Sequence, residues 1–395
     1  MMNDDMMNDA GQLMQWGFRF PAEVEGLRAR VREFARAEIA SVAARNDDEE
    51  HFPIETLRKM AGAGLLGVIS PKELGGLGMS NVALGAVVEE IAKVDLSCAI
   101  ICSMQNTLGN LLHGWGDELR ASVNRAGDIV GLATSEPDSG SDISQIRTTA
   151  IKQGDHLVIN GTKRHVSLVP GATALAVSAT MEIEPGRSAT TLVKVETNRP
   201  GVSWEAIPEM GQRAHQLAEV YFRDVRVPLS NVMGEEGKAM AMNFVRWNVS
   251  RAVSALISLG TATGALDLAT EYAKKRVVYG KPIARFEAVQ FPIVEQYTRV
   301  EAGRWLAYRA LWGADNGVAS AKEASMAKLY GARTAFEACD VALQTHGADG
   351  YTRDLPLERM LRDVRGMYFS GGTPQIHSIN IGREIFGKGY APHRD

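Results

Sequence analysis

The sequence has little of several features that mark particular classes of protein. Its 395 residues include three cysteines, Cys98, Cys102 and Cys339, with no CxxC pair, so a reducing compartment fits better than secretion. Lysine and arginine (43) do not exceed aspartate and glutamate (47), and the net charge of −4 leaves no basic footprint for nucleic acid. No uncharged apolar run reaches the ~18–20 residues that span a bilayer. These absences favour a cytoplasmic protein with neither membrane insertion nor a nucleic-acid partner.

Common cofactor and metal signatures are missing as well. No GxGxxG opens a helix after a strand, and the Gly-Lys pairs at 237–238 and 280–281 lack the spacing of a phosphate loop. The eight histidines form neither HxxxH nor HExxH, so we expect no metal site. The acidic start of the chain does not resemble a signal peptide, and residues 1–20 are predicted to form a flexible tail.

The apolar periodicity changes twice along the chain. A long apolar helix is predicted from Val82 through Leu112. Farther on, alternating runs predict strands, and Asn160-Gly161 predicts a hairpin turn because both central positions of such a turn need positive φ. Helical spacing then returns to the end. We therefore expect an α+β fold with an N-terminal helical domain at 21–127, a middle antiparallel β domain at 128–237 and a C-terminal helical domain at 238–395.

Six separated motifs occur in the order and at the separations typical of one family: "SEPDSGSD", "GTKRHVS", "MGQRAHQLAEVYFRDVRVP", "RVVYGKPIARFEAVQ", "QTHGADGYTRDLPLERMLRDVR" and "GGTPQI". From about residue 21 to 388 the chain resembles the acyl-CoA dehydrogenase family. The resemblance implies an FAD-bound homotetramer whose C-terminal domain is a four-helix bundle. It also implies a substrate that is an acyl thioester of coenzyme A or of a carrier protein.

The resemblance further implies which residues contact FAD and substrate. In the middle domain the FAD residues would be Leu132, Thr134, Ser135, Ser141, His165 and Ser167, with Ser167 near flavin N5. Residues expected to reach the FAD of a neighbouring subunit are Arg276, Val278, Phe286, Gln344, Gly347 and Ala348, and Thr373 and Gln375 would also contact FAD. Substrate contacts would come from Ser141, Arg251, Ile101 and Met104. Arg276 has the planar donors that suit a pyrophosphate, whereas Glu287, where we expect a Gln, would repel it.

The catalytic base of this family has no counterpart in the sequence. Family chemistry needs a base for the α-proton while the β-hydrogen leaves as hydride to the flavin. The base is a Glu just before the Gly-Thr of the last motif or, in a minority, a Glu on an earlier C-terminal helix. These positions are Gly371 and Ser250 here. No acidic residue lies between Glu236 and Asp267, and none lies near residue 371, so the base is unknown.

Three explanations remain open at this stage. Asp95 could serve as a relocated base, although a helix-surface or capping role is favoured for it. The reaction could differ, as in enoyl reduction, elimination or oxygenation of an acyl thioester. The chain could also be a non-catalytic subunit of a hetero-oligomer. The leading prediction is α,β-dehydrogenation with transfer of electrons to an electron-transfer flavoprotein.

Overall fold

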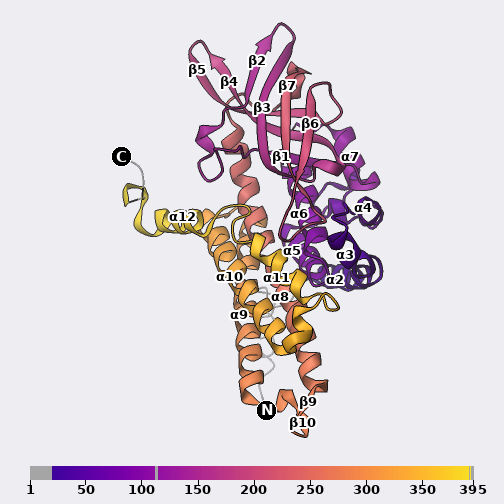
Figure 1. Ribbon diagram of the computed structural model, residues 1–395. Coiled ribbons are helices and arrows are strands. Elements are labelled where there is room, and N and C mark those ends of the chain that lie inside the picture. Colours follow the sequence, from indigo (N-terminus) through magenta and orange to yellow (C-terminus); the bar gives the residue numbers. More distant parts are fainter. Residues whose placement is uncertain (1–19, 112–113, 391, 393–395) are drawn as a thin grey trace, which may run out of the picture.

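The computed structural model describes residues 20–111, 114–390 and 392. Three parts follow one another along the chain (Figure 1): a group of short helices, a β-sheet at one end of the molecule, and long helices that extend away from the sheet. This is the predicted α+β fold of a helical, a β and a second helical domain. The tail predicted for residues 1–20 lies outside the described residues except for Phe20, whose ring packs 4.9 Å from that of Tyr308.

The first part contains six described α-helices: α2 (Ala22–Phe34), α3 (Ala40–Asp48), α4 (Ile54–Gly62), α5 (Asn81–Ala92), α6 (Leu96–Leu111) and α7 (Asp117–Ala126). A π-helical stretch, Ala35–Ile39, joins α2 to α3. The prediction of one helix from Val82 through Leu112 is wrong, because α5 ends at Ala92 and α6 begins at Leu96. Asp95 Oδ1 accepts a hydrogen bond from Cys98 N at 2.6 Å and so caps a new helix; Leu112 lies outside the described residues.

The second part is an eight-stranded sheet with the order β6-β7-β3-β2-β4-β5-β8 and β1 paired to β4. Most strand pairs are antiparallel, as predicted, but β1 and β2 both run parallel to β4, so the sheet is mixed. The strands are β1 (Ile129–Ala133), β2 (Thr149–Gln153), β3 (His156–Ser167), β4 (Ala172–Glu184), β5 (Arg187–Glu196), β6 (Val202–Ile207), β7 (Leu217–Pro228) and β8 (Val232–Met233).

The Asn160-Gly161 pair forms a bulge and not the predicted hairpin turn. Strand β3 continues through both residues, and its register with β7 shifts between Ile159 and Gly161. The Asn160 side chain donates to Asp224 Oδ1 at 3.1 Å and accepts from Asp224 N at 2.8 Å. Asn160 is thereby tied to the neighbouring strand, and Gly161, with φ 151°, supplies the irregular backbone that a bulge requires.

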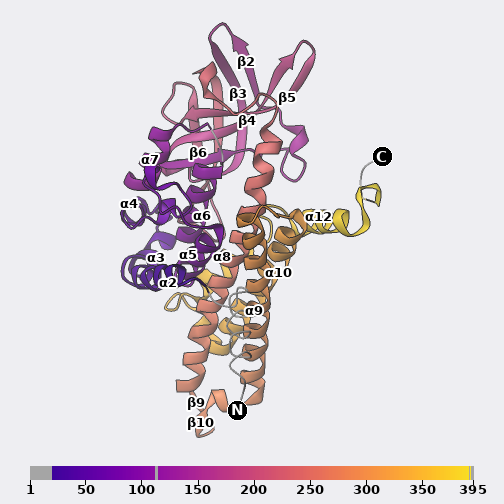
Figure 2. The same cartoon turned by 180° about the vertical axis from the view of Figure 1, so that it is seen from behind.

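The third part is dominated by three long helices that pack against one another, with two shorter helices against them. Figure 2 shows α12 projecting sideways from this group. The elements are α8 (Ala239–Lys275), β9 (Val277–Val278), β10 (Lys281–Pro282), α9 (Glu287–Asp315), α10 (Ala321–His346), α11 (Leu357–Gly366) and α12 (Pro374–Phe386). One continuous apolar core joins the three parts.

Two glycines allow α8 to pack closely against α5. A Cβ on Gly260 would lie 2.5 Å from the Glu89 carbonyl oxygen, and one on Gly264 would lie 2.2 Å from that of Lys93. Larger residues at these positions would push the two helices apart. Among the described residues, Ala241–Lys275 of α8 is the helix long and apolar enough to cross a membrane, but 72% of its most apolar window is buried inside the protein, which is the pattern of a core helix.

Candidate functional site

Two predicted cofactor motifs, distant in sequence, meet where β1 and β3 end. The backbone N–H of Arg164 in β3 donates to the Ser135 carbonyl at 2.9 Å. Thr134 shares a hydrogen bond of 2.9 Å with Ser178 Oγ on β4. Thr134, Ser135 and Ser167 are half-buried, and His165 is exposed. Hydroxyl and imidazole groups that can both donate and accept hydrogen bonds therefore gather at one edge of the sheet.

A buried ion pair holds the first of these motifs in place. Lys163 Nζ, fully buried, lies 2.8 Å from Glu136 Oε1 and donates to the Thr134 carbonyl at 3.0 Å. Glu136 also accepts from the backbone N–H groups of Arg147 and Thr148 at 2.7 and 2.9 Å. Burial lowers the pKa of Lys163 to about 8, while Glu136 opposes this shift. Each charge is thus compensated, and the backbone after β1 is fixed.

His215 is a site residue that the sequence analysis did not single out, although it lies in a quoted motif. Its Nε2 lies 2.9 Å from Ser167 Oγ and its Nδ1 lies 3.4 Å from the Gln212 carbonyl. Since that carbonyl can only accept, Nδ1 carries the ring proton and Nε2 accepts from the Ser167 hydroxyl. Burial lowers the pKa of His215 to about 4, so the ring is neutral at pH 7 and orients Ser167.

The backbone around Ser167 and His215 is conformationally unusual. Four non-glycine residues close to this pair in sequence have positive φ: His165 at 58°, Leu168 at 70°, Gln212 at 61° and Gln216 at 49°. Leu168 N donates to the Gln216 carbonyl at 3.2 Å, which joins the two segments. Such conformations each cost energy and cluster at sites where side chains must be held in fixed positions.

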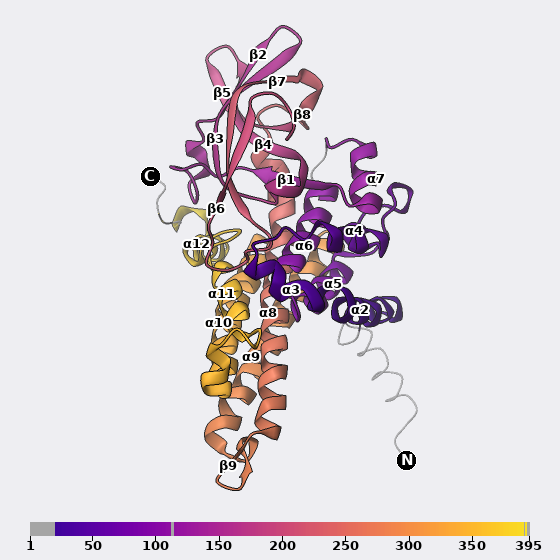
Figure 3. The same cartoon turned by 45° about the vertical axis from the view of Figure 1, so that its right-hand side comes forward.

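The strand β1 is also connected to the helix that carries the predicted substrate contacts (Figure 3). Gln105 of α6, fully buried, donates to the Val130 carbonyl at 3.1 Å and accepts from Val130 N at 3.0 Å. Ile101 is fully buried and Met104 is partly buried against the core. Ser141, the third predicted contact, lies exposed in the loop after β1.

Asp95 lies at the start of α6 and makes two structural contacts there. It caps the helix through Cys98 N, and its Oδ2 lies 3.7 Å from Arg359 Nη1 of α11. Asp95 is 5% exposed. A side chain that caps a helix and faces a buried cation stabilises the fold at that point. This is the geometry expected for the capping role of Asp95.

Neither of the two positions expected to carry the base bears a carboxylate. Ser250 of α8 is half-buried, and its hydroxyl donates to the Trp247 carbonyl at 3.3 Å. Gly371 lies in the exposed turn between α11 and α12 with φ 69°. Arg251 follows Ser250, and its charge acts on His377, whose ring is close to Gly372.

The remaining predicted FAD residues lie elsewhere on the chain. Arg276 and Val278 follow the far end of α8, about 39 Å along the helix from Ser250 at 1.5 Å per residue. The end of α10 lies beside them, because Tyr272 stacks on His346 at 4.3 Å and bonds to Asp349 at 3.3 Å. Gln344, Gly347 and Ala348 are exposed there, and Phe286 lies under Lys281 Nζ at 4.3 Å. One copy of the chain does not bring this group to the sheet edge.

The last predicted FAD residues open α12, and Glu287 opens α9. Thr373 caps α12 by accepting from Ile376 N at 3.4 Å, and Gln375 is exposed in its first turn. Glu287 is exposed next to Phe286, and Ile283 N in the turn before α9 donates to the Arg276 carbonyl at 2.8 Å.

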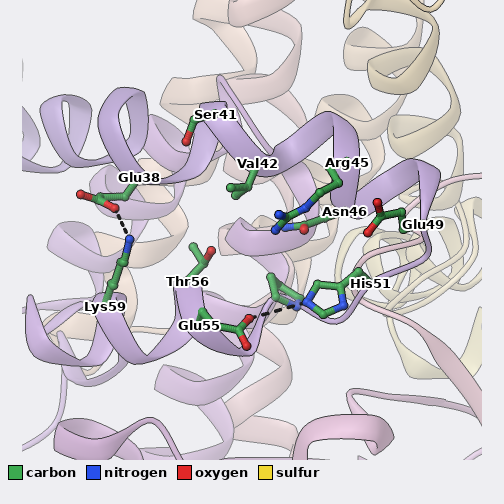
Figure 4. A pocket seen from close by; sticks show the side chains of 11 residues that line it. Glu38, Ser41, Val42, Arg45, Asn46, Glu49, His51, Glu55, Thr56 and Lys59 are labelled. Carbon is green, nitrogen blue, oxygen red and sulfur yellow. Dashed lines mark hydrogen bonds and ion pairs between the residues drawn. The ribbon is translucent and has the colours of Figure 1, made fainter.

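A polar surface pocket between α3 and α4 is separate from all these residues (Figure 4). Its charged groups are already paired in part: Lys59 Nζ lies 2.6 Å from Glu38 Oε2, and His51 Nε2 lies 3.6 Å from Glu55 Oε2. No predicted cofactor or substrate residue lines it. In the part of the chain that the structure describes, no group of three or more His, Cys, Asp or Glu side chains is arranged to hold a metal ion.

Comparisons with known proteins agree with the resemblance. Sequence models of the acyl-CoA dehydrogenase N-terminal, middle and C-terminal domains match residues 21–121, 131–225 and 235–386. The chain is 33% identical to acryloyl-CoA reductase (NADH) from Anaerotignum propionicum over 95% of this chain and 97% of that protein. It is 32% identical to the caffeyl-CoA reductase-Etf complex subunit CarC from Acetobacterium woodii, over 92% and 98%.

A solved structure shares the whole arrangement. The prolyl acyl carrier protein oxidase AnaB matches with a TM-score of 0.87 and 27% identity over 93% of this chain and 100% of that chain. The three domain matches occur in the same order as the helical, β and helical parts of the fold. The chain therefore belongs to the acyl-CoA dehydrogenase family of flavoenzymes.

Proposed function

We propose that the protein is an FAD-dependent oxidoreductase that acts on an acyl thioester of coenzyme A or of a carrier protein, most simply by α,β-dehydrogenation. The observation that supports this most directly is the meeting of the "SEPDSGSD" and "GTKRHVS" motifs at the sheet edge, where Arg164 N bonds to the Ser135 carbonyl. The names of two relatives cover both kinds of thioester: one is acryloyl-CoA reductase, and the other is a prolyl acyl carrier protein oxidase.

The donor set at the sheet edge fits the polar rim of a flavin. Thr134, Ser135 and Ser167 offer hydroxyls, and the nearby carboxylate of Glu136 is neutralised by Lys163. FAD, when bound, accepts the hydride and supplies the redox chemistry. The chain's own residues would bind and orient it: Leu132, Thr134, Ser135, Ser141, His165 and Ser167 from one subunit, with Thr373 and Gln375.

The second group of predicted FAD residues supports a shared cofactor site in a homotetramer. Arg276 and Gln344 lie at the end of the long helices, far from the sheet of the same copy. A neighbouring copy would have to supply them, together with Val278, Phe286, Gly347 and Ala348. The domain boundaries 21–127, 128–237 and 238–395 and a cytoplasmic location belong to the same proposal. The Etf-complex relative supports an electron-transfer flavoprotein as redox partner.

Reduction of an enoyl thioester is the second candidate reaction. Neither Gly371 nor Ser250 brings a carboxylate to the site, and a positioned base is worth about 10²–10⁴ in rate. A relative named acryloyl-CoA reductase shows 33% identity. Reduction does not abstract an α-proton from a saturated thioester, which is the step that the missing carboxylate would perform; hydride from the reduced flavin would reach Cβ, and a proton from water would have to reach Cα.

Anaerobic spectroscopy of the purified holoprotein tests the proposal. We expect yellow protein whose flavin absorbance bleaches when saturated acyl-CoAs or acyl carrier proteins are added, with free coenzyme A as the control. Flavin that stays oxidised with every saturated thioester, but is reoxidised by an enoyl thioester after dithionite reduction, would assign the reductase reaction. Protein that binds FAD only together with another chain would contradict the proposal and favour a non-catalytic subunit.

A further inference from the structure

Three basic side chains from three helices converge beside the turn between α11 and α12. Lys328 of α10 donates from Nζ to the Met367 carbonyl in this turn. His377 of α12 lies against it, because a Cβ on Gly372 would be 3.1 Å from His377 Cε1. Arg251 of α8 is close enough to affect the pKa of both groups. We call Arg251, Lys328 and His377 the basic cluster.

Two members of the cluster are buried, whereas Arg251 is half-buried with its guanidinium 5.8 Å from the centre of the Trp247 ring. Lys328 and His377 are each 1% exposed. Both ring nitrogens of His377 and Nε of Arg251 lack a hydrogen bond of normal geometry. Among the residues that the structure describes, no carboxylate lies within ion-pair distance of Arg251 or Lys328, and no acidic group acts on the pKa of any cluster member.

The electrostatic consequence is visible in the pKa values. Burial, and then Arg251, lowers the pKa of Lys328 to about 7. Burial, Lys328 and Arg251 lower the pKa of His377 to about 3, while a contact with the Gly372 backbone opposes this in part. A further cation, Arg246 in α8, has a pKa lowered to about 10 by burial and by Arg251. Like charges are thus held together without a counterion.

Elsewhere the same chain pairs its buried cations with carboxylates. Lys163 lies 2.8 Å from Glu136, Arg304 Nε lies 2.5 Å from Glu89, and Arg362 Nη2 lies 2.6 Å from Asp47. An unpaired buried charge is strongly unfavourable. The basic cluster and the neighbouring Arg246 therefore differ from these paired cations, and an anion from outside the chain would complete the cluster.

The turn beside the cluster has room for such an anion. Gly371 is exposed, and no atom lies within 4 Å of the position that its Cβ would occupy. Gly371 and Ser250, the two residues at which an acid was expected, adjoin the cluster without adding a negative charge. An acyl group that carries its own carboxylate could supply that charge through charge-assisted hydrogen bonds to the guanidinium, ammonium and imidazole groups.

We propose that Arg251, Lys328 and His377 bind a carboxylate on the acyl part of the substrate, so that the preferred thioester is that of a short dicarboxylic acid. This inference rests on the proposed action on acyl thioesters. It names the substrate class: a succinyl-like group, which keeps the β-hydrogen that dehydrogenation removes and whose second carboxylate completes the basic cluster.

Matched ligands test this with the FAD-loaded protein. Malonyl-CoA, which has no β-hydrogen and therefore reports binding alone, and isovaleryl-CoA have terminal groups of similar shape but different charge, as do succinyl-CoA and 4-methylpentanoyl-CoA. Dissociation constants from anaerobic calorimetry, with the flavin spectrum recorded in parallel, should show at least one dicarboxylic thioester binding about 10- to 100-fold more tightly than its neutral match, the range of a charge-assisted contact. Lys328→Met and Arg251→Met should reduce that ratio to about one by weakening the binding of the dicarboxylic thioester. Arg251→Lys, which keeps the charge, should retain part of the ratio.

The outcomes separate the inference from the proposed function. Equal affinities within both pairs, in wild-type protein whose flavin bleaches with the neutral thioesters, would overturn the inference and leave the proposed function intact. This wild-type comparison does not depend on the folding of a variant. Protein that binds neither FAD nor any thioester would contradict the proposed function and the inference with it.

Two further measurements identify other sources of the anion. Free malonate that raises the melting temperature of wild-type protein but not of Lys328→Met, with no preference among thioesters, would assign the cluster to a free carboxylate and overturn the substrate claim. Loss of FAD from Lys328→Met and Arg251→Met would show that the cluster holds an anionic part of the cofactor, and would also contradict the inference.

Discussion

Substitution of Gly371 by glutamate would place a carboxylate in the turn between α11 and α12 and tests the proposed chemistry directly. No atom lies within 4 Å of the new Cβ, so the side chain has space. The backbone φ of 69° costs a residue with a side chain about 1–2 kcal/mol. Lys328 and Arg251 nearby favour the ionised form of the carboxylate, which is the form that can accept a proton.

The expected gain in rate is large, whereas the expected loss of stability is small. A positioned base contributes about 10²–10⁴ in rate, so Gly371→Glu should bleach its flavin with saturated acyl-CoAs at least about 10²-fold faster than wild-type protein. The matched control is Gly371→Gln, which has the same backbone strain and nearly the same shape but no base. Stopped-flow absorbance under anaerobic conditions measures both variants. Equal rates for the Glu and Gln variants, at equal FAD content, would refute the assignment of this turn to the reacting site.

Other residues give further predictions. His215→Asn should flatten the dependence of stability on pH in acid. Burial holds the pKa of His215 at about 4, below its ordinary 6.5, so the contribution of the neutral ring to the free energy of unfolding is complete above pH 6.5 and falls by about 3 kcal/mol as the pH drops toward 4. Urea unfolding of both proteins at several pH values would show or contradict this difference. Asp95→Ala should lower the free energy of unfolding by about 1–2 kcal/mol through loss of the α6 cap, with more from the unpaired Arg359, whereas Asp95→Asn should keep most of the cap; a fall of 10²-fold or more in kcat for Asp95→Asn at unchanged stability would instead identify a base. Arg276→Gln should release FAD more readily from the assembled protein, and the same effect from the neighbouring exposed Lys275→Gln would count against a specific contact.

The helical and β parts could be predicted from the periodicity of apolar residues. This periodicity is visible in the sequence because each element buries one face. Two local predictions failed, each because of a side-chain hydrogen bond that the apolar pattern or the turn composition does not record. The spacing of apolar residues continues through residues 93–95, and what breaks the helix is the Asp95 cap, which also faces Arg359, 264 residues later. Asn160-Gly161 has the composition of a hairpin turn, but Asp224 of β7 takes both hydrogen-bonding groups of the Asn160 side chain.

The candidate site was predictable only where a motif is contiguous. The segments around Ser135 and Ser167 could be identified from the sequence. The lack of an acid at residues 250 and 371 could also be read directly from it. The basic cluster could not be predicted, since its members come from α8, α10 and α12 and no spacing rule relates them. The role of His215 was also invisible, because its effect depends on the hydroxyl of Ser167, 48 residues earlier in the chain.

The position of the Lys328 pKa gives the basic cluster a pH dependence with a definite sign. At a pKa of about 7, Lys328 is charged below pH 7 and loses its proton above it, while Arg246 and Arg251 of α8 stay charged and His377 of α12, with a pKa of about 3, stays neutral. A bound carboxylate favours the charged lysine, so the complex takes up a proton when it forms near or above pH 7.

The affinity ratio of succinyl-CoA to 4-methylpentanoyl-CoA should therefore be constant from pH 6 to 6.5 and fall by up to tenfold per pH unit above 7. Calorimetry in two buffers of different ionisation enthalpy would detect the proton uptake, and Lys328→Met should abolish it. A ratio that stays constant from pH 6 to 9 in wild-type protein would show that Lys328 does not face the ligand.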